Sequence, residues 1–207
     1  MYLKRAKAIK KLPIRRKGTK YVARASSHIK DGVPVVIAVR DMLGLAKTAK
    51  EVKEIIKEKL IKINGKIVKN PKESIRLFNV LEIGKKYRLT ILPTGKFSFE
   101  EIKDSVRLCK IINKKILRGK KIQLNFHDGT NILSNENINI GDSIELDFDG
   151  KIRKVISFEK GKNSFVISGR SVGLIGVVKG LGSRKVIIKF KDSDKEVELD
   201  KSHVIVI

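Results

Sequence analysis

The sequence has no tryptophan and one cysteine, and aromatic residues make up only 5% of its 207 residues. Because a lone cysteine forms neither an internal disulfide nor a cysteine-rich zinc site, we expect Cys109 to be a small core residue. His28, His127 and His203 stand singly, without the paired spacing of metal ligands. The sequence therefore predicts no metal site, no other cofactor, and a core built from Ile, Leu, Val and Phe.

Long apolar segments are also missing. No stretch approaches the roughly 18 apolar residues of a membrane-spanning helix. Without Trp, the chain lacks the apolar face typical of helices that lie on a membrane surface. Residues 1–30 contain no apolar core of the length that a signal peptide needs. We therefore expect a cytoplasmic protein that does not bind membranes.

Acidic residues are few relative to basic ones. The chain has 47 Lys and Arg against 22 Asp and Glu, which gives a formal net charge of +25 and a pI near 10.2. A positive charge of this size is typical of proteins that bind nucleic acid. Neither G-x-G-x-x-G nor G-x-x-x-x-G-K-S/T occurs, so no nucleotide-binding loop is expected. We also expect no small-molecule substrate.

The N-terminal segment concentrates this charge. Residues 1–30 contain 11 Lys or Arg and no Asp or Glu, and Pro13 and Gly18 interrupt any long helix. We expect an arm that becomes ordered only against phosphate, although a disordered tail that merely speeds association is the alternative. The predicted RNA contacts of the arm are Lys4, Arg5, Arg15, Arg16, Lys17, Lys20 and Arg24.

The charge falls off along the chain. Residues 1–84 carry 22 basic and 7 acidic side chains, whereas residues 85–207 carry 25 and 15. The stretch 122–150 has no Lys or Arg and six acids. We expect these acids to form a face that points away from RNA, toward solvent or a basic protein neighbour. They are Asp128, Glu136, Asp142, Glu145, Asp147 and Asp149.

A helix and a hairpin are predicted between residues 48 and 69. Thr48-Ala49-Lys50-Glu51 has the pattern of a capping box, which starts a helix, with Val52, Ile55, Ile56 and Leu60 on its apolar face. Asn64-Gly65 supplies the positive φ angles of a tight turn between 60–62 and 66–69. Taken locally, the lysines here could be an ordinary solvated face.

From residue 85 the apolar period changes to two, which predicts strands. Asp128-Gly129 and Asp149-Gly150 mark hairpin turns, and Ser98-Phe99-Glu100-Glu101 is a second capping-box pattern that predicts one short helix. We expect a small, mostly antiparallel β-barrel. Its strands are predicted at 87–92, 108–116, 120–126, 143–148, 152–158 and 165–167.

The last segment places glycines between short β-runs over Gly169–Val178, as a tightly curved five-stranded barrel requires. It resembles a KOW motif, which implies an SH3-like barrel. The further strands are predicted at 186–190, 197–199 and 204–207, with a turn at 192–194.

Residues 36–83 resemble the S4 RNA-binding motif, best seen in Leu43-Gly44-Leu45-Ala46, Thr48 and Ile63-Asn64-Gly65. In that family two helices and a hairpin grip bent or junctional RNA. Two positions depart from the pattern, since Ala49 replaces a common arginine and Lys59 replaces a common glycine at the helix end. The implied contacts are Lys47, Lys50, Lys53, Asn64, Lys66 and Lys69.

The order of these parts resembles the small-subunit ribosomal protein S4e family of archaea and eukaryotes. The implied fold is α+β, with a basic arm (1–30), an S4-type helix-helix-hairpin module (31–84), a β-rich middle module (85–165) and a KOW barrel (166–207). The resemblance implies a structural, non-catalytic protein that binds small-subunit rRNA beside neighbouring ribosomal proteins. Two alternatives are a KOW- and S4-bearing assembly or transcription factor, and an RNA-modifying enzyme.

Overall fold

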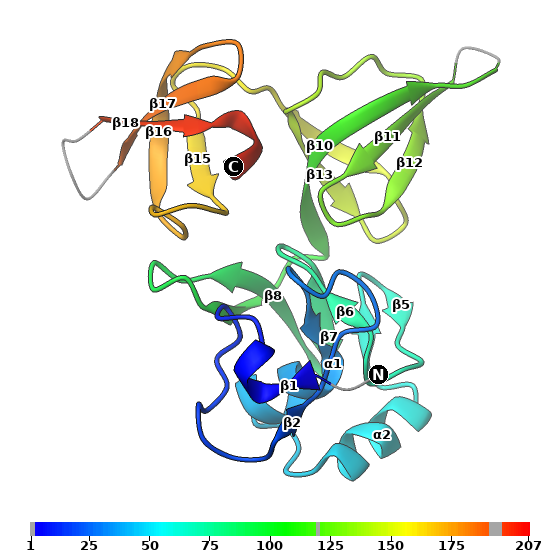
Figure 1. Cartoon of the computed structure of the whole chain (residues 1–207). Helices are drawn as coiled ribbons and strands as arrows, with labels where there is room; N and C mark the ends of the chain where they lie inside the picture. Colours follow the sequence, from blue (N-terminus) through cyan, green and yellow to red (C-terminus); the bar gives the residue numbers. More distant parts are fainter. Residues whose placement is uncertain (1–2, 119–120, 191–195) are drawn as a thin grey trace. The chain divides into compact units, whose positions relative to one another are not determined.

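The computed structural model describes residues 3–118, 121–190 and 196–207, and divides the chain into two compact units (Figure 1). The first unit is Met1–Ser105 and the second is Val106–Ile207. Strands dominate both, and helices are few and short.

The first unit is built on an antiparallel five-stranded sheet in the order β5-β4-β7-β8-β9. Two short pairs, β1–β2 and β3–β6, accompany it. The strands of the unit are β1 (Leu3–Lys4), β2 (Tyr21–Val22), β3 (Val33–Pro34), β4 (Lys62–Ile63), β5 (Lys66–Ile67), β6 (Ser74–Ile75), β7 (Val80–Ile83), β8 (Lys85–Ile91) and β9 (Phe97–Ile102). The sheet crosses the boundary predicted after residue 84, because Lys85–Arg88 of β8 pair with β7.

Short helices pack beside this sheet. The helices are η1 (Arg5–Lys7), α1 (Val35–Ile37), which continues as the π-helical turn η2 (Ala38–Met42), and α2 (Ala49–Lys57). Helix α2 begins where the sequence predicts, with the Thr48 side chain accepting from the Glu51 amide. Val52 and Ile56 are buried on its inner face, whereas Leu60 lies beyond the helix and is 57% exposed.

The second capping-box pattern does not start a helix. Ser98–Glu101 lies inside β9, where Phe97 and Phe99 pair with Ile91 and Leu89 of β8. The predicted helix is therefore wrong. Cross-strand pairing and burial of Phe97 determine the conformation here, and they outweigh the local helix-starting signal of the capping-box pattern.

The predicted hairpin is confirmed. Asn64 and Gly65 have φ angles of 50° and 77° between β4 and β5, as a two-residue turn that matches the strand twist requires. Lys59, which stands where a glycine is common, has a φ of 60°. A side chain at such a φ is strained, because Cβ approaches the following carbonyl oxygen.

The strain at Lys59 gives a prediction with an opposite-signed control. Lys59→Gly is expected to stabilise the protein by about 0.5–1 kcal/mol, since relief of the left-handed strain exceeds the added chain entropy. Lys57→Gly removes another exposed lysine, this one within α2, and should destabilise by about 1 kcal/mol. Thermal unfolding midpoints measure both. A lower midpoint for Lys59→Gly would contradict the strain.

The N-terminal arm is folded onto the first unit. Leu12 and Ala25 are each only 5% exposed. The Phe97 amide donates to the Lys11 carbonyl at 2.8 Å, and the Ser26 amide donates to the Lys72 carbonyl at 2.8 Å. The expectation that the arm orders only against phosphate is therefore wrong, because the arm buries apolar side chains of its own between its charges.

The second unit contains two antiparallel five-stranded sheets. The first runs β12-β11-β10-β13-β14 and the second β18-β17-β16-β15-β19. Their strands are β10 (Val106–Ile116), β11 (Ile122–Phe126), β12 (Asn131–Ser134), β13 (Ser143–Asp147), β14 (Ile152–Ile156), β15 (Asn163–Val166), β16 (Ile175–Leu181), β17 (Lys185–Phe190), β18 (Glu196–Asp200) and β19 (Val204–Val206), with the short helix η4 (Lys201–His203) before β19.

The period-two pattern placed most of these strands correctly. The turns at Asp128-Gly129 and Asp149-Gly150 lie in the β11–β12 and β13–β14 hairpins. Position 176 in β16 requires glycine, since a Cβ there would lie 2.6 Å from the Lys189 carbonyl oxygen. The predicted turn at 192–194 lies outside the described residues, and closure of the last sheet into a barrel stays a prediction.

Two of the six acids predicted to form an outward-facing surface over 122–150 are buried in the fold. Asp128 and Asp142 are buried at 6% exposure each. Asp142 accepts from the amides of Asn139 and Phe158, at 3.2 and 2.8 Å. These two carboxylates are used inside the fold, because loop amides need acceptors where water is excluded. Glu136 and Asp149 are exposed.

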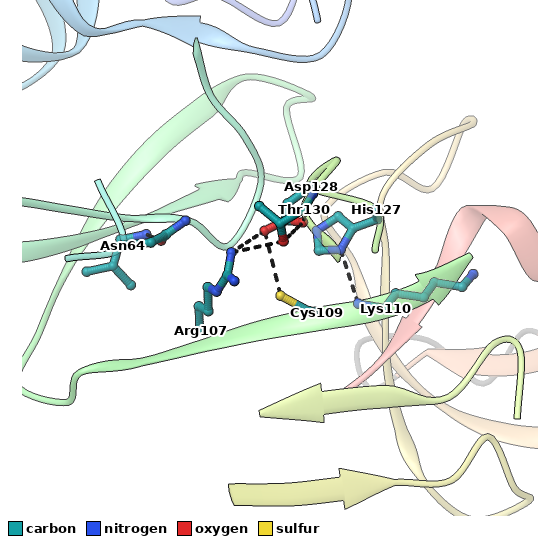
Figure 2. A network of polar contacts seen from close by, with 8 residues as sticks. Asn64, Arg107, Cys109, Lys110, His127, Asp128 and Thr130 are labelled. Atoms are coloured by element: carbon teal, nitrogen blue, oxygen red, sulfur yellow. Dashed lines mark hydrogen bonds and ion pairs between the residues drawn. The ribbon is translucent and has the colours of Figure 1, made fainter. Parts of the chain in front are cut away.

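Asp128 is the centre of a buried polar network, shown in Figure 2. Arg107 Nη1 lies 2.5 Å from Asp128 Oδ2, and the side chains of this pair are 9% and 0% exposed. Thr130 donates to Asp128 Oδ1 from its amide at 2.9 Å and from its hydroxyl at 2.6 Å. The thiol of Cys109 donates to Oδ2 at 3.8 Å, and burial raises its pKa. Cys109 is a core residue, as predicted.

Lys110 is a buried cation that ties β10 to the end of the chain. Its Nζ donates to the carbonyls of Lys201 and Val204, at 2.5 and 2.7 Å. Burial lowers the pKa of Lys110 to about 8. The ammonium is thus held by backbone acceptors in a place that disfavours its charge.

This burial predicts a pH dependence of stability. In the unfolded chain the lysine pKa is about 10.4, so the folded state releases this proton first and gains stability as pH rises from about 8 to about 10.4. The free energy of unfolding of the wild type minus that of Lys110→Met should therefore increase over this window. Urea unfolding at stepped pH measures it, with Lys154→Met as the exposed control. A flat difference would contradict the burial of a charged amine.

Candidate nucleic-acid interface

A cleft of about 880 Å³ lies in the first unit. Its walls come from three stretches far apart in the sequence: the arm, the segment from α1 through η2 to the first turns of α2, and Pro71–Lys72. We call it the arm cleft. Its basic lining residues are Arg5, Arg15, Lys17, Arg40, Lys47, Lys53 and Lys72.

The charge of the arm cleft is almost entirely positive. Asp41 is its one acidic lining residue. Arg40 neutralises it through two hydrogen bonds, from Nε at 3.0 Å and from Nη2 at 2.8 Å. Apart from Asp41, no acidic residue lines the cleft to offset the other cations, so the cleft attracts anions.

Arg5 shapes the arm side of the cleft. Its Nε donates to the Thr19 carbonyl at 2.7 Å, its Nη1 to the Arg15 carbonyl at 2.6 Å, and its Nη2 to the Thr19 hydroxyl at 2.9 Å. These bonds close the loop that presents Arg15 and Lys17. Gly18 has a φ of 141°, and a Cβ there would lie 3.0 Å from the Arg5 guanidinium. Arg5 therefore acts on the loop, while Arg15 and Lys17 are exposed.

The capping box shapes the helix side. Glu51 accepts from the Lys47 amide at 2.8 Å and from the Thr48 hydroxyl at 2.9 Å. The Lys47 bond, followed by that of Thr48, lowers the pKa of Glu51. This carboxylate fixes the backbone of Lys47 at the start of α2, and Lys53 follows along the helix. Both lysines are exposed.

The structure brings five of the predicted contacts together in the arm cleft, namely Arg5, Arg15, Lys17, Lys47 and Lys53. The other basic ones do not line it. Lys4, Arg16, Lys20, Lys50, Lys66 and Lys69 are exposed elsewhere on the unit, and Arg24 is half-buried.

Asn64 has a role in the fold. It is 9% exposed, and its Oδ1 accepts from the Val80 amide at 2.9 Å (Figure 2). This bond joins the hairpin turn to β7. Asn64 therefore stabilises the hairpin, and we expect no RNA contact from its side chain.

Sequence reasoning missed two cleft residues, Arg40 and Lys72. Arg40 lies in the π-helical turn η2, within the S4-like segment 36–83. Its signal was its position in that motif, but its pairing with Asp41 is not visible in the sequence. Lys72 reaches the cleft because the arm docks on its backbone at Ser26.

Residues 3–118, 121–190 and 196–207 contain no group of three His, Cys, Asp or Glu that could hold a metal ion. They also contain no helix long and apolar enough to cross a membrane.

A helical turn, a capped helix and a tight hairpin beside a positive cleft define the chain as an S4-domain RNA-binding protein. The S4 domain profile matches residues 37–81, and the profile of Ribosomal family S4e matches residues 83–153. Relatives over the whole chain are small ribosomal subunit proteins. The chain belongs to the eS4 family, which is a family of ribosomal structural proteins and not of enzymes.

The similarity covers most of each relative. The chain is 33% identical to small ribosomal subunit protein eS4 of Methanospirillum hungatei, covering 100% of this chain and 93% of that protein. It is 36% identical to the eS4 protein of Methanocella arvoryzae, over 86% of this chain and 80% of that protein. The solved 30S ribosomal protein S4e from Thermoplasma acidophilum has a TM-score of 0.72 at 27% identity, covering 86% of this chain and 95% of that one.

Proposed function

We propose that this protein performs the structural role of the eS4 family in the small ribosomal subunit by holding small-subunit rRNA in the arm cleft. The observation that carries the proposal is the convergence of arm and helix cations on one cleft. Arg15 and Lys17 come from the arm, and Lys47 and Lys53 from the start of α2. Two basic segments that are far apart in the sequence thus line the same positive cleft. This arrangement is expected if both segments bind the same polyanion.

Most contacts are expected to go to phosphates and 2′-hydroxyls. Lysines on flexible stems bind phosphate as point charges, and Arg15 can add a bidentate contact. Such contacts position RNA by its shape and read little base sequence. The exposed lysines outside the cleft, Lys50, Lys66 and Lys69, would extend the contact along the RNA.

The remaining features of the proposal concern the surroundings. We expect the protein to act in the cytoplasm, on the ribosome, beside neighbouring small-subunit proteins and without a small-molecule substrate. We also infer that the last sheet, β15–β19, forms the KOW-type barrel. Its support is the glycine at position 176, which allows β16 to approach β17 closely.

Sedimentation of tagged protein from cell lysate, with moderate-salt and high-salt washes, tests this function. The expected result is stoichiometric protein on the small subunit that survives the high-salt wash. Substoichiometric or salt-labile protein would overturn the proposal and favour an assembly or transcription factor.

A further inference from the structure

The walls of the arm cleft are more apolar than phosphate binding requires. Pro13, Ile14, Val22, Ala23 and Pro71 line it and are half-buried. A groove that tracks a phosphate backbone needs cations and hydrogen-bond donors. Apolar side chains at this place would instead contact water, unless a ligand with an apolar face covers them.

An aromatic ring stands at the same wall. Tyr21 lines the cleft and is 45% exposed, and the Lys20 ammonium lies 5.6 Å from the centre of its ring. Single-stranded RNA is recognised by stacking of bases on aromatic rings, with cations beside them for the phosphates. Tyr21 provides such a ring, and the basic residues of the lining provide the cations.

We propose that the arm cleft encloses one unstacked nucleotide of the bound RNA. Its base stacks on Tyr21 and lies against the apolar wall of Ile14, Val22 and Pro71, and its phosphates lie on the rim formed by Arg15, Lys17 and Lys53. The inference rests on the proposed function, and it adds the class of ligand that the cleft takes.

The size and the energetics of the site fit this ligand. Sites that enclose small molecules have volumes of about 300–1,000 Å³, and the cleft has about 880 Å³. Removing a base from a stacked duplex costs a few kcal/mol, and the cost is least where the base is already unpaired. The cleft therefore selects a bulged or junctional nucleotide over a base within a regular helix.

Binding of three RNA hairpins that differ at one position tests the proposal. The first has a regular duplex stem, the second carries a single-nucleotide bulge with 2-aminopurine, and the third carries an abasic residue in the same bulge. The bulge with its base should bind about tenfold tighter than the abasic bulge, because only the base can stack on Tyr21 and cover the apolar wall. The fluorescence of 2-aminopurine should change on binding.

A pair of matched variants locates the effect. Ile14→Ser should remove the preference for the base over the abasic bulge while leaving the salt dependence of binding intact. Ile67→Ser makes the same change at an exposed isoleucine outside the lining, 44% exposed, and should retain the preference.

The outcomes distinguish failure of the enclosed-nucleotide proposal from failure of the proposed function. Salt-dependent binding with equal affinity for the base and abasic bulges overturns the enclosed nucleotide and leaves the proposed function standing. Failure of all three hairpins and of small-subunit rRNA to bind overturns both. The hairpin comparison uses wild-type protein, so it stands even if Ile14→Ser fails to fold.

Discussion

Replacing Lys47 and Lys53 together by glutamate is expected to weaken binding of small-subunit rRNA by about one to two orders of magnitude at moderate salt. Both lysines line the arm cleft from the helix side, and Glu51 holds the backbone of Lys47 in place. Loss of two phosphate contacts should also reduce the slope of log affinity against log salt by about 1.4 to 1.8. Filter binding across a salt series measures both quantities.

The matched control reverses two exposed lysines of the second unit, Lys154→Glu with Lys179→Glu. The net charge then falls by the same amount, so long-range attraction changes alike. If the two double variants lose affinity and salt slope equally, the effect is one of overall charge, and the cleft is not the binding site. Circular dichroism of each variant shows whether α2 is still formed.

Five of the seven basic residues that line the arm cleft could be predicted from the sequence, but their arrangement could not. Arg5 and Arg15 lie in the same acid-free segment and have the same local signal. The Arg5 guanidinium donates to the carbonyls of Thr19 and Arg15 and to the Thr19 hydroxyl. The Arg15 side chain is exposed. The difference arises from the path of the arm, which depends on the burial of Leu12 and Ala25.

The two capping-box patterns adopt different structures, again because burial elsewhere in the fold determines the conformation. The capping box at Thr48 starts a helix, because the following residues bury one helical face at Val52 and Ile56. The pattern at Ser98 is part of β9, where Phe97 is 2% exposed against the sheet. A capping box contributes about 1 kcal/mol, which is less than burying one phenylalanine in a paired strand contributes. Local signals therefore predict elements only where tertiary burial agrees with them.

Two Asp-Gly turns provide the second large prediction. Both turns formed as expected, yet Asp149 is exposed, whereas the Asp128 carboxylate is fully buried against Arg107. Asp128→Ala should lower the free energy of unfolding of the second unit by about 3–5 kcal/mol, because it leaves a buried guanidinium without its partner. Asp149→Ala should change it by no more than about 0.5 kcal/mol. Hydrogen exchange at the Ile111 amide, which donates to the Asp142 carbonyl at 2.9 Å, measures the free energy of unfolding of this unit.

The cost at Asp128 has two sources, the ion pair and the turn, and a second pair of variants separates them. Asp128→Asn keeps an acceptor for the Thr130 amide, at 2.9 Å from Oδ1, but still leaves the Arg107 charge unpaired. Arg107→Met combined with Asp128→Asn removes the charge as well and should recover at least half of the loss, since a buried pair replaced on both sides costs far less than a broken one. If the double variant is as unstable as Asp128→Asn alone, then packing of the Arg107 side chain stabilises the turn, and its charge does not matter.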